Sequence, residues 1–287
     1  MTRINSRYLV IAAWIFTSQI AIAQAIPLIG EPRHDYGQSV IGAYEGWWQN
    51  ADGTYSLLVG YFSRNMVEQM DIPVGPNNRI EPAGPDYGQP THFMPGRGWG
   101  NWVITAPKDF GGKKLVWTLT AYGRATTLTF GLDPLWEIAP FSEIGMNNTP
   151  PILSFDEGGP TVQGPAPRTE STTAKMGAPL TLTTIVRDDA KTFPNTKGPS
   201  APPATITWTK FRGPGEVKFA NPKPPVVENK LKADVAHPFA GKASTTVTFS
   251  EPGEYELNVT GNDWSGEGGR GFLCCWTNAH MKVTVKK

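Results

Sequence analysis

The sequence predicts an all-β protein of two antiparallel β-sandwich domains, the C-terminal one immunoglobulin-like. Gly and Pro are abundant, with 31 and 27 in 287 residues. Both break helix interiors but suit the turns between short strands. Many short runs also alternate apolar with polar residues at a period of two, which is typical of half-buried strands. Without a leader, the length suits two domains of roughly 110 to 140 residues, each able to bury a core.

The first 23 residues are typical of a cleaved secretory signal. Arg3 and Arg7 precede an apolar run from Tyr8 to Ile20, and Ala21-Ile22-Ala23 supplies a small-x-small cleavage site, with a second after Ala25. The alternative is a membrane anchor, but the run is shorter than the roughly 20 apolar residues that span a bilayer. We therefore expect a periplasmic or extracellular chain with no membrane span after cleavage.

The charge balance indicates which partners to expect. Losing the two leader arginines reduces the 26 basic side chains to 24, against 25 acidic ones. Such a balance gives no electrostatic reason to bind nucleic acid or an anionic membrane. The partners that we consider are a polysaccharide, a small ligand or an envelope protein.

The N-terminal β domain is expected over 33–147. Two β-rich runs flank Asn50-Ala51-Asp52-Gly53, which predicts a hairpin. A Pro- and Gly-rich passage at 71–100 leaves little room for strands, and loops this long are usually functional or tied down by their own side chains. Alternation predicts three further strands, with a turn at 109–112 between the first two: 101–106, 114–121 and 126–130.

Composition shifts at 148–178, which we interpret as a linker or an edge strand, and the second domain follows at 179–287. Its order is a strand, an Asp-rich loop, a strand centred on Trp208, a hairpin with Pro-Gly-x-Tyr and a last strand, which is typical of an immunoglobulin-like sandwich. The predicted strands are 180–186, 204–211, 245–249, 255–259 and 279–285.

The hairpin carries a resemblance to a known family. Phe249-Ser-Glu-Pro-Gly-Glu-Tyr255 and Val259-Thr-Gly-Asn-Asp263 resemble the E–F corner and F strand of Ig-like domains of the polycystic-kidney-disease type. This resemblance implies the fold of roughly the last hundred residues and almost nothing about function. Through Tyr44-Glu-Gly-Trp-Trp and Asn262-Asp-Trp-Ser-Gly-Glu-Gly-Gly, the chain also resembles a group of bacterial exported proteins, which implies export and this architecture but no activity.

Cys274 and Cys275 are adjacent and are the only cysteines. In an oxidising compartment they pair with each other or with another molecule. We favour a vicinal disulfide that forms a rigid kink and presents Trp276. Two alternatives stay open: thiols that pack as small apolar groups, and a soft metal site with His280 and Met281, which offers few ligands.

The immunoglobulin-like topology brings the loop after the second strand near the loop before the last strand. Asp188 and Asp189 should then lie near Asp263, where their oxygens suit Ca²⁺. The alternative is that Asp188 and Asp263 cap turns and pair with Arg187 or Arg270. We call this region the loop cluster. Its residues expected to contact a ligand are Asp263, Trp264, Cys274, Cys275, Trp276 and Asn278.

The N-terminal domain has more aromatic residues than one core needs. Aromatic faces with polar neighbours suit sugar binding, but packing in the core and beneath the long loop is the favoured interpretation. The residues are Tyr44, Trp47, Trp48, Tyr61, Tyr87, Trp99 and Trp102.

No common catalytic motif is present in the sequence. The function predicted is therefore an exported non-enzymatic protein that binds a ligand or envelope partner through loops. One alternative is a secreted hydrolase using carboxylates or His92, with Asp86 or Glu81 as its acid–base partner. The other is a structural component of an envelope assembly, joined through an apolar patch or strand edge.

Overall fold

Strands and two 3₁₀ turns make up the regular structure of the described residues, which contain no α-helix. The computed structural model describes residues 34–82, 84, 86–143, 145, 147–191, 203–265 and 274–287. The predicted leader at 1–23 lies outside them. In the described part of the chain, no helix has the length and apolar character needed to cross a membrane. The prediction of an all-β protein is confirmed.

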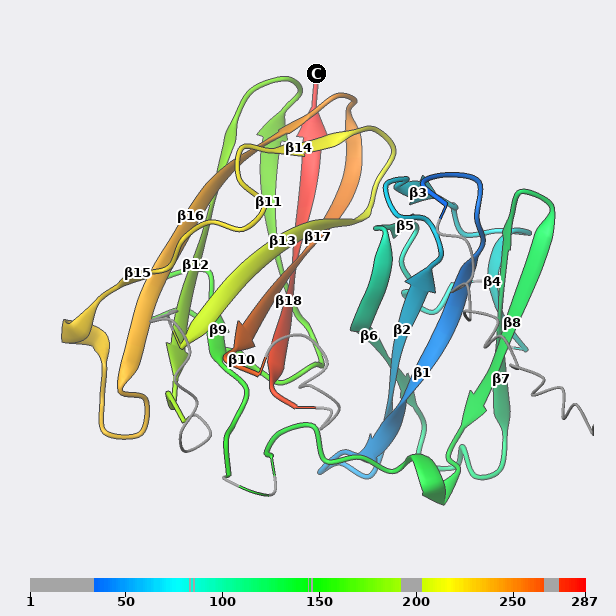
Figure 1. Cartoon of the computed structure of the whole chain (residues 1–287), viewed down its shortest axis with the longest axis horizontal. Helices are drawn as coiled ribbons and strands as arrows, with labels where there is room; N and C mark the ends of the chain where they lie inside the picture. Colours follow the sequence, from blue (N-terminus) through cyan, green and yellow to red (C-terminus); the bar gives the residue numbers. More distant parts are fainter. Residues whose placement is uncertain are drawn as a thin grey trace, which may run out of the picture. The chain divides into compact units, whose positions relative to one another are not determined.

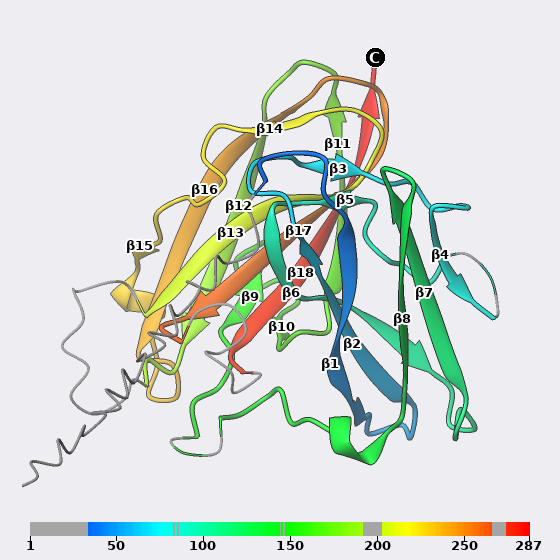
Figure 2. The same ribbon diagram turned by 45° about the vertical axis from the view of Figure 1, so that its right-hand side comes forward.

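Two three-stranded sheets enclose the N-terminal core, in the orders β1-β2-β6 and β4-β7-β8, and β3 pairs with β5. Figure 2 shows the two sheets as separate layers. Between them Trp102 packs edge-on against Trp117, with ring centroids 4.8 Å apart. The elements are β1 (Val40–Gln49), β2 (Tyr55–Ser63), β3 (Met70–Asp71), β4 (Asn78–Glu81), β5 (His92–Phe93), β6 (Gly96–Ala106), β7 (Lys114–Ala121), β8 (Arg124–Gly131) and η1 (Pro134–Trp136).

The predicted hairpin is confirmed as β1–β2, and the Asp52 carboxylate closes its turn by accepting from the Thr54 N–H at 2.9 Å. The strands predicted at 101–106 and 114–121 form within β6 and β7, but they do not pair with each other. β6 pairs with β2, and β7 pairs with β4 and β8. The turn between them therefore carries the chain from one sheet to the other.

The C-terminal half is a second sandwich, with sheet orders β10-β9-β12-β16-β14 and β11-β18-β17-β13 (Figure 1). The second sheet corresponds to the C, F and G strands of an immunoglobulin fold, and β12 and β16 correspond to B and E. Strand β11 pairs parallel to β18. The elements are β9 (Ile152–Ser154), β10 (Val162–Gln163), β11 (Arg168–Lys175), β12 (Leu180–Asp188), β13 (Ala204–Arg212), β14 (Val217–Phe219), β15 (Val227–Glu228), η2 (Lys230–Lys232), β16 (Phe239–Phe249), β17 (Gly253–Asp263) and β18 (Trp276–Lys286).

Two features make this sandwich immunoglobulin-like in detail. Trp208 on β13 is buried in the core, where such folds place a tryptophan on strand C. The Tyr255 hydroxyl donates to the Glu251 carbonyl at 2.9 Å and accepts from the Gly215 N–H at 3.0 Å, which forms a tyrosine corner. The fold expected from Pro-Gly-x-Tyr is confirmed.

The passage at 71–100 contains more regular structure than expected, namely β4, β5 and the start of β6. Asn78 organises it, because its Nδ2 donates to the carbonyls of Ile72 and Pro90 at 2.8 Å each. Its Oδ1 accepts from Trp117 Nε1 at 2.9 Å. The passage is therefore fixed by a buried side chain of its own.

Candidate functional site

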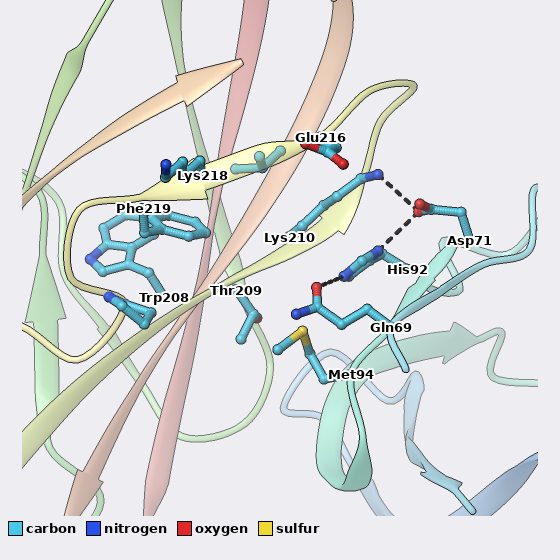
Figure 3. Close-up of a pocket in the computed structure, with 12 residues that line it drawn as sticks. Gln69, Asp71, His92, Met94, Trp208, Thr209, Lys210, Glu216, Lys218 and Phe219 are labelled. Atoms are coloured by element: carbon cyan, nitrogen blue, oxygen red, sulfur yellow. Dashed lines mark hydrogen bonds and ion pairs between the residues drawn. The ribbon is translucent and has the colours of Figure 1, made fainter. Parts of the chain in front are cut away.

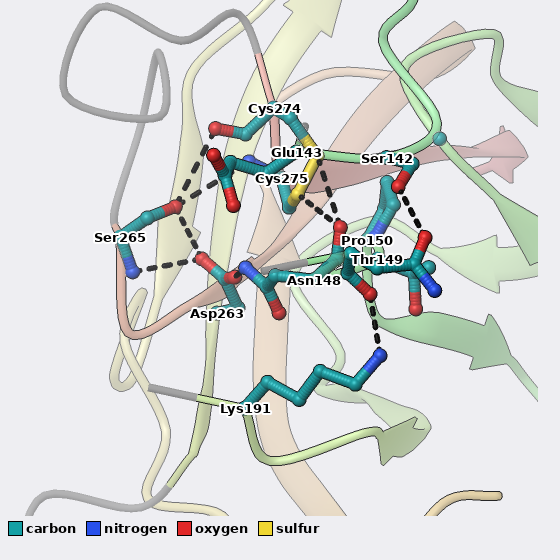
Figure 4. The surroundings of a disulfide bond; sticks show 12 residues. Ser142, Glu143, Asn148, Thr149, Pro150, Lys191, Asp263, Ser265, Cys274 and Cys275 are labelled. Atoms are coloured by element: carbon teal, nitrogen blue, oxygen red, sulfur yellow. Dashed lines mark hydrogen bonds between the residues drawn. A yellow bond between two sulfur atoms is a disulfide. The ribbon is translucent and has the colours of Figure 1, made fainter. Parts of the chain in front are cut away.

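The loop cluster lies where β12 and β17 end and β18 begins. Asp188 ends β12. Asp263 ends β17 and lies next to the cysteine pair (Figure 4). The Asp263 carboxylate accepts from the Ser265 N–H at 2.8 Å and from Asn148 Nδ2. The structure thus brings together the strand ends that the topology predicted.

The sulfur atoms of Cys274 and Cys275 are joined in the structure and buried, and that of Cys275 lies 3.4 Å from the Asn148 carbonyl (Figure 4). His280, considered as a soft-metal ligand, instead places its Nδ1 2.7 Å from a carboxylate oxygen of Glu256. Among the described residues, no group of three or more His, Cys, Asp or Glu side chains is arranged to hold a metal ion. The metal hypotheses gain no support here and stay predictions.

The three acids differ in environment. Burial raises the pKa of Asp188 to about 7, and the nearby charges of Asp189 and Asp263 act in the same direction. Burial also raises the pKa of Asp263, against hydrogen bonds that lower it. Asp189 accepts from the N–H and hydroxyl of Thr149 at 3.0 and 2.9 Å, and lies 3.4 Å from Lys191 Nζ. Asp188 and Asp263 accept from the N–H groups of Ala190 and Ser265, which matches the turn-capping alternative, but Arg187 pairs with Asp234 instead.

Of the residues expected to contact a ligand, Asp263, Cys274, Cys275, Trp276 and Asn278 are buried, and Trp264 is half-buried.

Two of these residues join the sandwiches instead. Trp276 packs against Trp48 and Leu58 in a third apolar cluster, and Asn278 Nδ2 donates to the Gly100 carbonyl at 2.7 Å. Their ligand-binding role stays a prediction, for which the structure leaves little accessible surface.

Most of the N-terminal aromatics pack in the core, as favoured. Trp47, Trp48, Tyr61 and Trp102 are buried, whereas Tyr44, Tyr87 and Trp99 are half-buried.

A cavity of about 540 Å³ lies elsewhere, between the long passage and the β13–β14 segment (Figure 3). Its polar residues include Gln69, Asp71, His92, Lys210 and Glu216, and its apolar ones Met94, Trp208, Val217, Phe219 and Pro222. Concave sites with an apolar lining and a few convergent polar groups are the usual form of ligand pockets. This cavity is therefore the candidate functional site.

A hydrogen-bonded triad of Asp71, His92 and Lys210 forms one wall of the cavity. Asp71 Oδ1 lies 2.9 Å from His92 Nδ1 and accepts from Lys210 Nζ at 2.8 Å (Figure 3). His92 and Lys210 are buried, while Asp71 is half exposed. The acid–base partners considered for His92 are engaged elsewhere, since Asp86 pairs with Arg212 and Glu81 with Arg79, and His92 pairs with Asp71 instead.

Asp71 is held ionised by this arrangement. Burial raises its pKa, but hydrogen bonds from His92 and Lys210 outweigh the burial and leave the pKa below its usual value. The second ring nitrogen of His92 lies 3.1 Å from Gln69 Oε1. Because both ring nitrogens are occupied, the histidine is fixed as part of the wall and is not presented to a substrate.

The sequence analysis missed Gln69, Asp71 and Lys210. Asp71 and Lys210 are 139 positions apart in the chain, so no local pattern links them. The one available signal was the length of the passage at 71–100, which indicated a functional loop without indicating its partner strand.

No protein-family model matches the chain, and no curated protein matches it. Solved structures with some similarity include a domain of intimin, with 12% identity, 87% of this chain and 100% of that chain covered, and a TM-score of 0.27. The C-terminal domain of ZirS has 14% identity, covering 55% and 85% of the two chains, with a TM-score of 0.23. Tandem Ig domains of titin have 10% identity, covering 86% and 98%, with a TM-score of 0.21. TM-scores this low support neither a common fold nor a shared function.

Proposed function

We propose that the chain is an exported, non-enzymatic binding protein that holds a small polar ligand in the cavity between the long passage and β13–β14. The observation that carries this is the hydrogen-bonded His92–Asp71–Lys210 triad, with His92 and Lys210 buried, in the wall of a cavity of about 540 Å³. That volume falls in the range of roughly 300–1,000 Å³ typical of small-molecule sites.

The lining supports a polar ligand. Asp71 and Glu216 offer acceptors and Lys210 and Lys218 offer donors, while Phe219 and Pro222 provide apolar surface. Buried Lys210 is already neutralised by Asp71, so binding does not require a ligand charge to compensate for it. A neutral or zwitterionic molecule with both donors and acceptors fits this lining best.

The N-terminal sequence supports export to the periplasm or the extracellular space. In such a compartment the adjacent cysteines are oxidised to the vicinal disulfide. Because both are buried, we assign the pair to the internal structure of the loop cluster.

A hydrolase is the second candidate, because His92 and Asp71 form the hydrogen-bonded pair that a general base and its orienting carboxylate require. It ranks second because the outer ring nitrogen, which would take the proton, is occupied by Gln69.

Filling the cavity tests the proposal. Thr209 lines the cavity on β13, and Thr207 lies two residues away on the same face of the strand and outside the lining. We expect Thr209→Trp to abolish binding and Thr207→Trp to preserve it. The measurement is a thermal-shift screen of sugars, amino acids and nucleosides, in which a ligand at about 100 times its Kd adds about 2.7 kcal/mol.

A hit that stabilises the parent and Thr207→Trp but not Thr209→Trp supports the site. If no compound stabilises the parent, or if hits stabilise Thr209→Trp equally, the cavity is not a ligand site.

A further inference from the structure

A second hollow, of about 200 Å³, lies in the N-terminal sandwich at the end of β8 and beside η1. Its aromatic walls are Tyr44, Phe130 and Trp136, and its charged residues are Lys114 and Asp133. It shares no lining residue with the triad cavity, so any site here is independent of the proposed function.

Trp136 is the unusual member of this hollow. Its exposed fraction is 48%, whereas Trp102, Trp117, Trp208 and Trp276 are at most 2% exposed. Its ring centroid lies 5.6 Å from that of Tyr44, which in turn lies 5.2 Å from Phe130. The three rings form a continuous aromatic row with Trp136 at its accessible end.

The row is held in place by hydrogen bonds of the surrounding backbone. The Tyr44 hydroxyl donates to the Gly131 carbonyl at 2.9 Å, and Trp47 Nε1 donates to the Asp133 carbonyl at 2.7 Å. The Asp133 side chain caps η1 by accepting from the Leu135 N–H at 3.0 Å. Such preorganisation lowers the ordering cost of binding, because the aromatic surface is already in position.

The charges indicate the kind of ligand. Lys114 and Asp133 carry opposite charges, and neither forms an ion pair with any residue in the described ranges. The Lys114 ammonium can therefore donate hydrogen bonds to a ligand, and the Asp133 carboxylate can accept them. A bound cation would be repelled by the Lys114 ammonium, and a bound anion would be repelled by the Asp133 carboxylate. A neutral ligand avoids both repulsions.

We propose that this hollow binds one neutral sugar ring of a glycan. The apolar face of the ring lies on Trp136, and its hydroxyl groups accept from Lys114 and donate to Asp133. The volume suits a single ring, since it is smaller than the roughly 300 Å³ of sites for drug-sized molecules.

The test is calorimetric titration with cellohexaose, chitohexaose and maltohexaose. We expect at least one hexaose to bind, and Trp136→Ala to weaken it by about tenfold or more, as truncation of a binding hot spot does. Leu135→Ala is the matched control, because Leu135 is on the same turn but outside the lining, and it should bind like the parent. Lys114→Met should also weaken binding while leaving the aromatic row intact.

Thr209→Trp should leave sugar binding unchanged, which separates this site from the triad cavity. Absence of saturable binding by all three hexaoses overturns the proposal, as does equal binding by the parent, Trp136→Ala and Lys114→Met. Binding of tetramethylammonium without binding of any hexaose would identify a cation site and would likewise overturn it.

Discussion

Asp188 shows how the environment of one residue determines its chemistry. Its Oδ1 accepts from the Ala190 N–H at 2.8 Å, but its buried Oδ2 has no hydrogen-bond partner among the described residues. Burial raises its pKa to about 7. Between about pH 4 and pH 7 the folded state therefore holds a proton that the unfolded state has released, so this group makes folding less favourable as pH rises through that window.

Asp188→Asn should remove this pH dependence. The amide cannot ionise, so the variant should gain stability relative to the parent between about pH 5 and pH 8, by up to about 4 kcal/mol if the whole shift is realised. Urea unfolding at both pH values measures the difference. Asp109→Asn, at an exposed carboxylate, is the control and should follow the parent. A variant with the parent's pH slope would mean that Asp188 is ionised throughout.

The sequence predicted where the acids of the loop cluster lie, but it did not predict that they are buried. The topology correctly placed Asp188 and Asp263 at strand ends on one side of the sandwich. Asn148 donates to Asp263 and Thr149 donates to Asp189, and both partners come from the segment interpreted as the start of a linker. Side-chain exposure is set by such distant contacts, which local patterns do not encode.

At the scale of elements, the tyrosine corner connects the β16–β17 hairpin to the loop between β13 and β14. The Tyr255 hydroxyl satisfies the Glu251 carbonyl and the Gly215 N–H together. Gly213 is required beside it, because a β-carbon there would lie 2.2 Å from the Tyr255 ring, at a backbone φ of +137°.

Tyr255→Phe should lower the free energy of unfolding by about 1–3 kcal/mol, because it leaves two backbone groups without their partner. Chemical denaturation measures the loss. Tyr122→Phe removes an exposed hydroxyl that donates to Glu68 and should cost much less. Equal losses in the two variants would show that the corner contributes nothing specific.

Strands were easier to predict than their pairing. Alternation located β7, β12 and β13 to within about two residues, because burial on one face fixes a period of two. It could not show that β6 and β7 enter different sheets, since the sequence of a strand does not specify which neighbour accepts its hydrogen bonds.

At the scale of the whole molecule, β13 belongs to one sandwich and supplies Phe211 to the core of the other. The Phe211 carbonyl accepts from the Thr91 N–H at 3.1 Å. On either side of it, Lys210 pairs with Asp71 and Arg212 with Asp86. The domain boundary predicted near 148 stays a prediction, but these contacts couple the sequences on its two sides.

Phe211→Ala should therefore affect cooperativity as well as stability. We expect a loss of about 3–5 kcal/mol from the cavity left in the N-terminal core. We also expect the calorimetric enthalpy to exceed the van't Hoff enthalpy, as the halves begin to unfold separately. Phe211→Leu, which keeps most of the volume, should remain closer to the parent. A single two-state transition in Phe211→Ala would show that other contacts are enough to couple the halves.

The adjacent cysteines have a consequence for biosynthesis. Four cysteines can be paired in three ways, so folding is delayed while incorrect disulfides are exchanged. Here Cys274 and Cys275 are the only two, so one intramolecular pairing exists and none within the chain can be wrong. On the proposed export route, maturation of this chain would need an oxidant but no disulfide isomerase.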